Sequence, residues 1–181
     1  MTNSIKKPLL VSIIGGSGYT GAELMRLISK HPYFTLFQVV ANRNAGKKIE
    51  DIFPHLRHLN LPDFISFEEM IFDDVDLIFC ALPHATSQEI IIKIPEGMKI
   101  IDLSADFRLE KVQEYERWYG QKHIAPLLQE KAVYGLTEIY KEKIKKGSLI
   151  ACTGCNSAAT LYPILPLLND RVIKDDNLTI N

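Results

Sequence analysis

The chain has 181 residues, of which 46% are hydrophobic and 24% charged, and its formal net charge is −1 at pH 7. These values are typical of a soluble globular protein with one domain and part of a second. The charge balance argues against a nucleic-acid or membrane partner. Three cysteines are too few for a disulfide scaffold, so we expect a reducing, cytoplasmic location.

Short apolar runs alternate with segments of helical periodicity along the chain. This alternation predicts an α/β fold with a doubly wound, mostly parallel sheet and helices on both faces. Pro163 and Pro166 are expected to bend the last helix or end it early. The expected strands are residues 9–14, 34–41, 75–82, 98–103 and 148–152, and the expected helices are residues 19–30, 67–72, 85–93, 110–119, 137–146 and 156–168.

A glycine-rich turn joins the first expected strand to the first expected helix. Gly16, Gly18 and Gly21 fit G-x-G-x-x-G in the context that a dinucleotide-binding loop requires. Glycines let the backbone turn tightly and approach a pyrophosphate, and a helix N-terminus attracts the anion. We therefore expect a Rossmann-like fold in which a nucleotide is held by Gly15, Gly16, Ser17, Gly18, Tyr19, Thr20 and Gly21. The alternative is a glycine-rich turn with no ligand.

The end of the second expected strand indicates which nucleotide is bound. NAD sites place an acidic residue there to bind the ribose hydroxyls, but this chain has Asn42-Arg43-Asn44. A guanidinium can pair with a 2′-phosphate, so Arg43 favours NADP; the alternative is a surface arginine in a turn. At the next strand end, Leu82 and Pro83 are expected to pack against the nucleotide, with His84 on the cofactor side.

Cys155 is the candidate nucleophile because it lies between an expected strand and an expected helix. Thiols at helix N-termini can be deprotonated at neutral pH. Cys152 completes a C-x-x-C pattern, but it falls within the strand, whereas a redox pair would place both cysteines at the helix entrance. We therefore interpret Cys152 and Cys80 as small core residues.

The stretch from Asp102 to Arg108 follows another strand end, where ligands gather in open α/β sheets. We expect Ser104 to contact the cofactor. Arg108 either clamps a phosphate or carboxylate of the substrate or forms an Asp–Arg pair that only ties down a loop. The histidines show no ligand spacing with one another or with the cysteines, so we predict no metal site.

Five stretches resemble the N-acetyl-gamma-glutamyl-phosphate reductase family of arginine biosynthesis. The stretches occur in the family's order and comprise Gly15–Leu24, Ala81–His84, Asp102–Leu109, Tyr134–Glu138 and the Gly154-Cys155 junction. The resemblance implies NADP as cofactor, an acyl phosphate as substrate and a homo-oligomeric complete protein. It also implies that the Cys155 thiolate displaces phosphate, that NADPH reduces the thioester to a semialdehyde, and that Arg108 occupies a phosphate-contacting position.

The resemblance also implies that part of the protein is missing. The family's catalytic histidine lies beyond residue 181, and Leu178-Thr179-Ile180 has the composition of a strand that has just begun. We therefore expect an N-terminal piece, too incomplete for catalysis: an NADP-binding domain at residues 1–154 and the start of an α+β substrate and dimerisation domain at residues 155–181.

Two alternatives remain open at this stage. The family usually has Asn-Pro-Gly-Cys-Tyr-Pro where this chain has Cys-Thr-Gly-Cys-Asn-Ser at residues 152–157. This difference leans towards aspartate-semialdehyde dehydrogenase or a related acyl-phosphate reductase. The second alternative is a non-catalytic NADP-binding module that keeps a cysteine.

Overall fold

The computed structural model describes residues 7–176 and 178–180. Its strands form one parallel sheet of seven strands in the order β3-β2-β1-β4-β5-β7-β6. The elements in chain order are β1 (Leu9–Ile14), α1 (Tyr19–Ile28), β2 (Phe34–Val40), η1 (Asn42–Asn44), α2 (Ile49–Ile52), η2 (Pro54–Leu59), β3 (Phe64–Ile65), β4 (Leu77–Cys80), α3 (Ser87–Ile91), β5 (Ile100–Asp102), α4 (Val112–Tyr119), α5 (Pro126–Lys131), β6 (Ala132–Gly135), α6 (Thr137–Lys146), β7 (Leu149–Cys152) and α7 (Cys155–Asn169). The predicted doubly wound sheet is confirmed.

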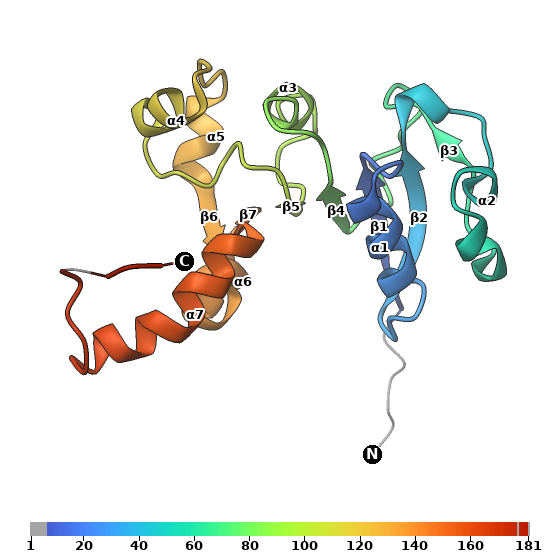
Figure 1. Cartoon of the computed structure of the whole chain (residues 1–181). Helices are drawn as coiled ribbons and strands as arrows, with labels where there is room; N and C mark the ends of the chain where they lie inside the picture. The colour runs from blue at the N-terminus through green and yellow to red at the C-terminus, as the bar shows by residue number, and fades with distance from the viewer. Residues whose placement is uncertain (1–6, 177, 181) are drawn as a thin grey trace.

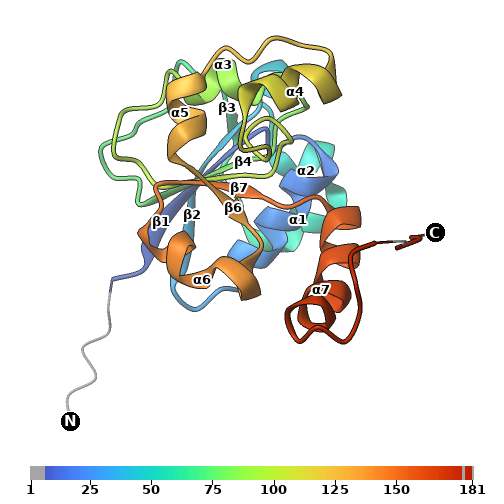
Figure 2. The same cartoon turned by 90° about the vertical axis from the view of Figure 1, so that its left-hand side faces the viewer.

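Helices cover both faces of the sheet. In Figure 2, α3, α4 and α5 lie on one side of the strands, and α1 and α6 lie on the other. Neighbouring residues of one strand therefore enter different cores: Ile13 packs with α1 and α2, whereas Ile14 packs with α3 and the α5 region. Burial on both faces explains why the central strands are apolar almost throughout.

The helix predicted at residues 67–72 does not form. The buried Gln38 side chain on β2 donates to the carbonyl oxygen of Ile71 at 2.8 Å and accepts from its N–H at 2.9 Å. Both backbone groups of Ile71 are therefore bonded to a side chain instead of to a helical turn, and the segment is an irregular loop.

Two outcomes near the C-terminus differ from expectation: the prolines do not end the last helix early, and residues 178–180 do not begin a strand. Helix α7 continues through Pro163 and Pro166 to Asn169, and both prolines are exposed, so their rings project towards solvent. Residues 178–180 form no strand. Helix α7 has no buried residue and extends from the carboxyl edge of the sheet (Figure 1). No helix of the described residues is long and apolar enough to cross a bilayer.

Candidate active site

The sheet has a topological switch point between β1 and β4. From β1 the chain moves outward through β2 to β3, and it then returns to β4 on the other side of β1 (Figure 1). In open α/β sheets, ligands bind in the crevice outside the carboxyl ends of the strands at this point. The glycine-rich turn at residues 15–18 lies at this point, between the end of β1 and the start of α1.

Three glycines, two in the turn and one in the first turn of α1, have no room for a side chain. Gly15 has φ +87°, and a Cβ there would lie 2.5 Å from the carbonyl oxygen of Ala81. A Cβ on Gly16 would lie 2.1 Å from Cγ1 of Val39, and one on Gly21 would lie 2.5 Å from the carbonyl oxygen of Gly16. The turn, the strand and the helix can therefore approach one another only without side chains at these three positions.

Gly18 differs from the other three glycines because a Cβ there would meet no atom within 4 Å. It is the N-cap of α1 and has extended backbone angles that any residue can adopt. Packing therefore does not explain a glycine here, whereas close approach of a ligand to the backbone does. This open backbone cradle in front of a ten-residue helix fits the pyrophosphate of a dinucleotide.

A cavity of about 610 Å³ opens beside this cradle. Its volume lies in the range of small-molecule and cofactor sites. Leu82, Pro83, Phe67 and Ile90 give it apolar walls, and Arg43 supplies a cation. The structure thus brings the predicted Gly15, Ser17, Gly18, Arg43, Leu82 and Pro83 to one cavity, while the exposed Tyr19 and Thr20 begin α1 next to it.

Arg43 lies on η1, directly after β2, and its side chain is exposed. No hydrogen bond or ion pair with another residue in the described part of the chain engages its guanidinium. Its neighbours Asn42 and Asn44 are uncharged, so no carboxylate occupies the position that would bind the ribose hydroxyls of NAD.

The wall formed by Leu82 and Pro83 continues into a strained turn that a buried aspartate holds. Ala85 has φ +67°, which is uncommon for a residue with a Cβ. The Asp106 carboxylate is fully buried and accepts hydrogen bonds from the N–H groups of Ala85 at 2.9 Å and Ser87 at 3.2 Å. Asp106 therefore stabilises the loop between β4 and α3.

His84 in the same turn lies against Asp106. Its Nδ1 lies 2.9 Å from Oδ1 of Asp106, and its ring packs on Tyr119 with a centroid distance of 4.5 Å. His84, which we expected on the cofactor side, is therefore held against Asp106 and Tyr119 and is not among the residues that line the cavity.

Ser104 does not line the cavity. Its side chain is buried, and its hydroxyl lies 2.6 Å from both Oδ2 of Asp102 and Oγ of Ser87. The structure therefore corrects the expectation of a direct cofactor contact: Ser104 belongs to a polar network behind the cavity wall. Ser87 and Tyr115, which no sequence pattern indicated, belong to the same network.

Arg108 connects two strand ends through backbone carbonyls. Its Nε donates to the carbonyl oxygen of Cys152 at 2.7 Å, and its Nη2 donates to that of Leu103 at 2.9 Å. Nη1 lies 3.2 Å from the position that a Cβ on Gly154 would occupy. Arg108 thus ties down the loop before Cys155, although its partners are carbonyl groups and not the aspartate that we considered.

The three cysteines occupy different environments. Cys155 is exposed and is the first residue of the 15-residue helix α7. Cys152 is half-buried at the end of β7, and burial raises the pKa of its thiol. Cys80 is fully buried in β4, where burial raises the pKa of its thiol well above its usual range. Only Cys155 is accessible at a helix N-terminus.

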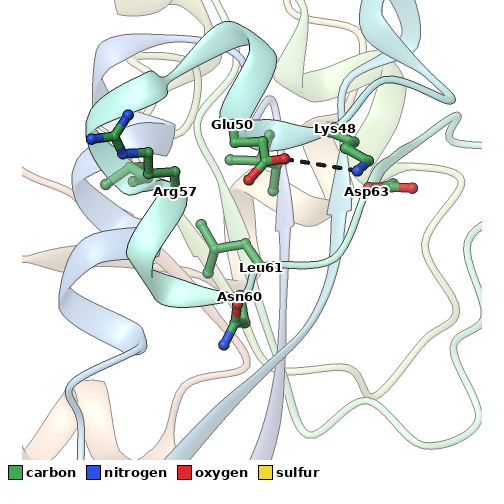
Figure 3. A pocket seen from close by; sticks show the side chains of 8 residues that line it. Lys48, Glu50, Arg57, Asn60, Leu61 and Asp63 are labelled. Carbon is green, nitrogen blue, oxygen red and sulfur yellow. Dashed lines mark ion pairs between the residues drawn. The ribbon is translucent and has the colours of Figure 1, made fainter.

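A second cavity of about 380 Å³ lies between α2 and η2 (Figure 3). Its side chains are mostly exposed and carry both charges, and Lys48 pairs with Glu50 at 3.7 Å. None of the predicted site residues lines it.

Comparison with known proteins identifies the family. Residues 10–147 match the family described as semialdehyde dehydrogenase, NAD binding domain. The chain belongs to this semialdehyde dehydrogenase family. Its NAD-binding domain accounts for the glycine turn and the cavity at the switch point, and it ends shortly before β7 and Cys155.

Similar proteins within this semialdehyde dehydrogenase group carry more specific names. The chain is 52% identical over 171 residues to N-acetyl-gamma-glutamyl-phosphate reductase of Rhodobacter capsulatus, covering 94% of the chain and 50% of that protein. It is 48% identical over 182 residues to a probable chloroplastic N-acetyl-gamma-glutamyl-phosphate reductase of Arabidopsis thaliana, covering 99% of the chain and 45% of that protein. The chain thus spans about half the length of these relatives.

A solved structure supports the fold. The aspartate semialdehyde dehydrogenase of Candida albicans, determined with NADP, superposes with a TM-score of 0.65 at 19% identity, covering 91% of this chain and 48% of that one. At this identity the likeness concerns the semialdehyde dehydrogenase fold alone.

Proposed function

We propose that this chain is the cofactor-binding half, together with the nucleophilic cysteine, of an NADP-dependent N-acetyl-gamma-glutamyl-phosphate reductase. One observation carries the proposal: the dinucleotide cradle and the exposed Cys155 lie on the same edge of one parallel sheet. Strands β1 and β7 are separated by β4 and β5, so the two strands that lead to these sites are about 14 Å apart across the sheet. The names of the relatives support the choice of substrate.

The chemistry assigned to Cys155 is acyl transfer to sulfur. The thiolate attacks the acyl carbon, the new C–S bond forms, and the bond from that carbon to the phosphate oxygen breaks, releasing phosphate. A bound NADPH would supply the hydride that reduces the thioester to the aldehyde and frees the thiolate. Arg108 holds the loop that carries Cys155, and we propose that its Nη1, beside Gly154, binds an oxygen of the leaving phosphate.

The remaining assignments concern the complete protein. We propose that residues 1–154 form the cofactor domain and that α7 begins a substrate domain supplying the catalytic histidine and the contacts of a homo-oligomer. The described cysteines are free thiols, and a cysteine nucleophile needs reducing conditions. We therefore propose a cytoplasmic location, although the Arabidopsis relative is named as chloroplastic.

Assays of the protein encoded by the complete reading frame test the substrate. With NADP and phosphate, oxidation of N-acetylglutamate semialdehyde is expected, and oxidation of aspartate semialdehyde is not. Turnover of aspartate semialdehyde alone would instead assign the protein to that dehydrogenase. Cofactor binding without turnover of either aldehyde would indicate a non-catalytic module.

The Arg43→Ala variant tests the choice of cofactor. Because the guanidinium is expected to form charge-assisted hydrogen bonds with the 2′-phosphate, NADP affinity should fall by about tenfold or more while NAD affinity stays unchanged. Fluorescence titration with both cofactors measures this difference. Arg57→Ala, in the cavity of Figure 3, is the matched control and should change neither affinity. Equal binding of NAD and NADP by the unaltered chain would contradict the assignment.

A further inference from the structure

Behind the cavity wall, two buried carboxyl groups are joined by a chain of hydrogen bonds. Oδ2 of Asp102 lies 2.6 Å from Oγ of Ser104, which lies 2.6 Å from Oγ of Ser87, which in turn lies 2.9 Å from Oδ2 of Asp106. Both aspartates are fully buried, and the two serines are 5% exposed or less. The four side chains of this hydrogen-bonded chain are therefore almost completely shielded from bulk water.

Counting protons along this chain shows that one is missing if both carboxyl groups are ionised. Three contacts of 2.9 Å or less join Asp102, Ser104, Ser87 and Asp106 in succession, and each needs one hydrogen atom. A longer contact of 3.3 Å between Oγ of Ser87 and Oδ2 of Asp102 adds no hydrogen, because it would use the same Ser87 hydroxyl. The two hydroxyl groups supply one hydrogen each, and a carboxylate supplies none. The third hydrogen therefore has to come from one of the two carboxyl groups, which is then a neutral acid.

Asp106 has the environment of an ionised carboxylate. Besides the hydroxyl of Ser87, it accepts from two backbone N–H groups and from the hydroxyl of Tyr115 at 3.2 Å, and Nδ1 of His84 lies 2.9 Å away. Burial and the negative charge of Asp106 raise the pKa of Tyr115 to about 12, which keeps that hydroxyl a donor.

Asp102 has the environment of a neutral acid. Its Oδ1 accepts from the N–H of Ser104 at 3.0 Å, which leaves Oδ2 as the protonated oxygen. The titratable groups facing it from the packed elements are Cys80 on β4, Cys152 on β7 and Asp106. The cation beside this group is Arg108, but its Nε and Nη2 donate to the carbonyl oxygens of Cys152 and Leu103 and not to Asp102. No ion pair within the described residues includes Asp102, and burial raises the pKa of its carboxyl group.

We propose that Asp102 is protonated in the folded protein at neutral pH and that its proton sets the direction of every hydrogen bond in this network. Asp102 then donates to Ser104, Ser104 donates to Ser87, and Ser87 donates to Asp106. Asp106 is then the ionised end of the chain and the positioning residue for the cavity wall. It acts through the strained turn at Ala85, which lies between the lining residues Pro83 and Thr86.

The Asp102→Asn and Asp106→Asn variants test this asymmetry. The Asp102→Asn side chain can form the same hydrogen bonds as the neutral acid, because its amide oxygen accepts from the N–H of Ser104 and its amide N–H donates to Oγ of Ser104. The NADP affinity of this variant should therefore change by about twofold or less. An asparagine at 106 removes the charge that several donors face, so the affinity should fall by about tenfold or more. Titration of both folded variants measures these affinities. Equal losses in the two variants would overturn the proposal.

Infrared spectroscopy provides a second readout that a purely structural role would not produce. In D₂O at neutral pH, the unaltered chain should show a C=O stretching band of a protonated carboxyl group that is absent from Asp102→Asn. Absence of this band from the unaltered chain would overturn the proposal. The cofactor readout depends on the proposed function, whereas the infrared band does not, so a chain that shows the band but binds no NADP would contradict only the proposed function.

Discussion

Replacing Cys155 with serine is expected to lower turnover of N-acetylglutamate semialdehyde in the complete protein by on the order of 10³-fold or more. A serine hydroxyl at this position is not ionised at neutral pH, so no acyl-enzyme forms at a useful rate. Cofactor affinity should stay nearly unchanged, because Cys155 is three strands away from the glycine turn. A coupled assay of NADPH formation and a binding titration separate the two effects.

Cys152→Ser is the matched control for this prediction. Its side chain is half-buried at the end of β7, and the contact of this residue with Arg108 uses the backbone carbonyl, which the substitution retains. Turnover should therefore persist. Iodoacetamide at neutral pH should label Cys155 alone, because burial protects Cys80 and raises the pKa values of both other thiols. Turnover that survives in Cys155→Ser would remove the nucleophile from the proposed mechanism.

The sequence was most informative where function depends on local backbone geometry. The glycine turn, the strand before it and the helix after it lie within residues 9–28, so spacing alone could locate them. Alternation of apolar and helical segments likewise predicted the main strands. The short β3 and β6 at the two edges of the sheet were missed. β3 has only two residues, and β6 follows α5 directly, with no turn residue to separate it from the helix.

The polar network was not predictable because its contacts join residues far apart in the sequence. Ser87 forms hydrogen bonds with Asp102 and Asp106, which lie 15 and 19 positions further along the sequence. No sequence pattern indicates that these residues contact one another. Arg108 was placed correctly at a strand end, but its partners are backbone carbonyls, which every residue possesses. Sequence patterns could therefore identify which residues carry chemistry, but not which of them contact a ligand and which support those that do.

Replacing Gly21 with alanine is expected to destabilise the chain by about 2–4 kcal/mol. Alanine favours the helix by about 1 kcal/mol over glycine, but its Cβ would lie 2.5 Å from the carbonyl oxygen of Gly16. Gly16 has little room to move away from this Cβ, because Val39 lies on its other side. The space between Gly16 and the Val39 side chain is already too small to hold a Cβ. The clash should therefore outweigh the gain in helix propensity, and urea denaturation measures the difference.

Gly18→Ala in the same turn separates packing from ligand binding. Nothing lies within 4 Å of its Cβ position, so we expect a loss of about 1 kcal/mol or less, from the poorer N-cap. The added methyl group would nevertheless occupy the space into which the pyrophosphate fits, and NADP affinity should fall by about tenfold or more. A Gly18→Ala chain that binds NADP as tightly as the unaltered chain would show that the open cradle is not the pyrophosphate site.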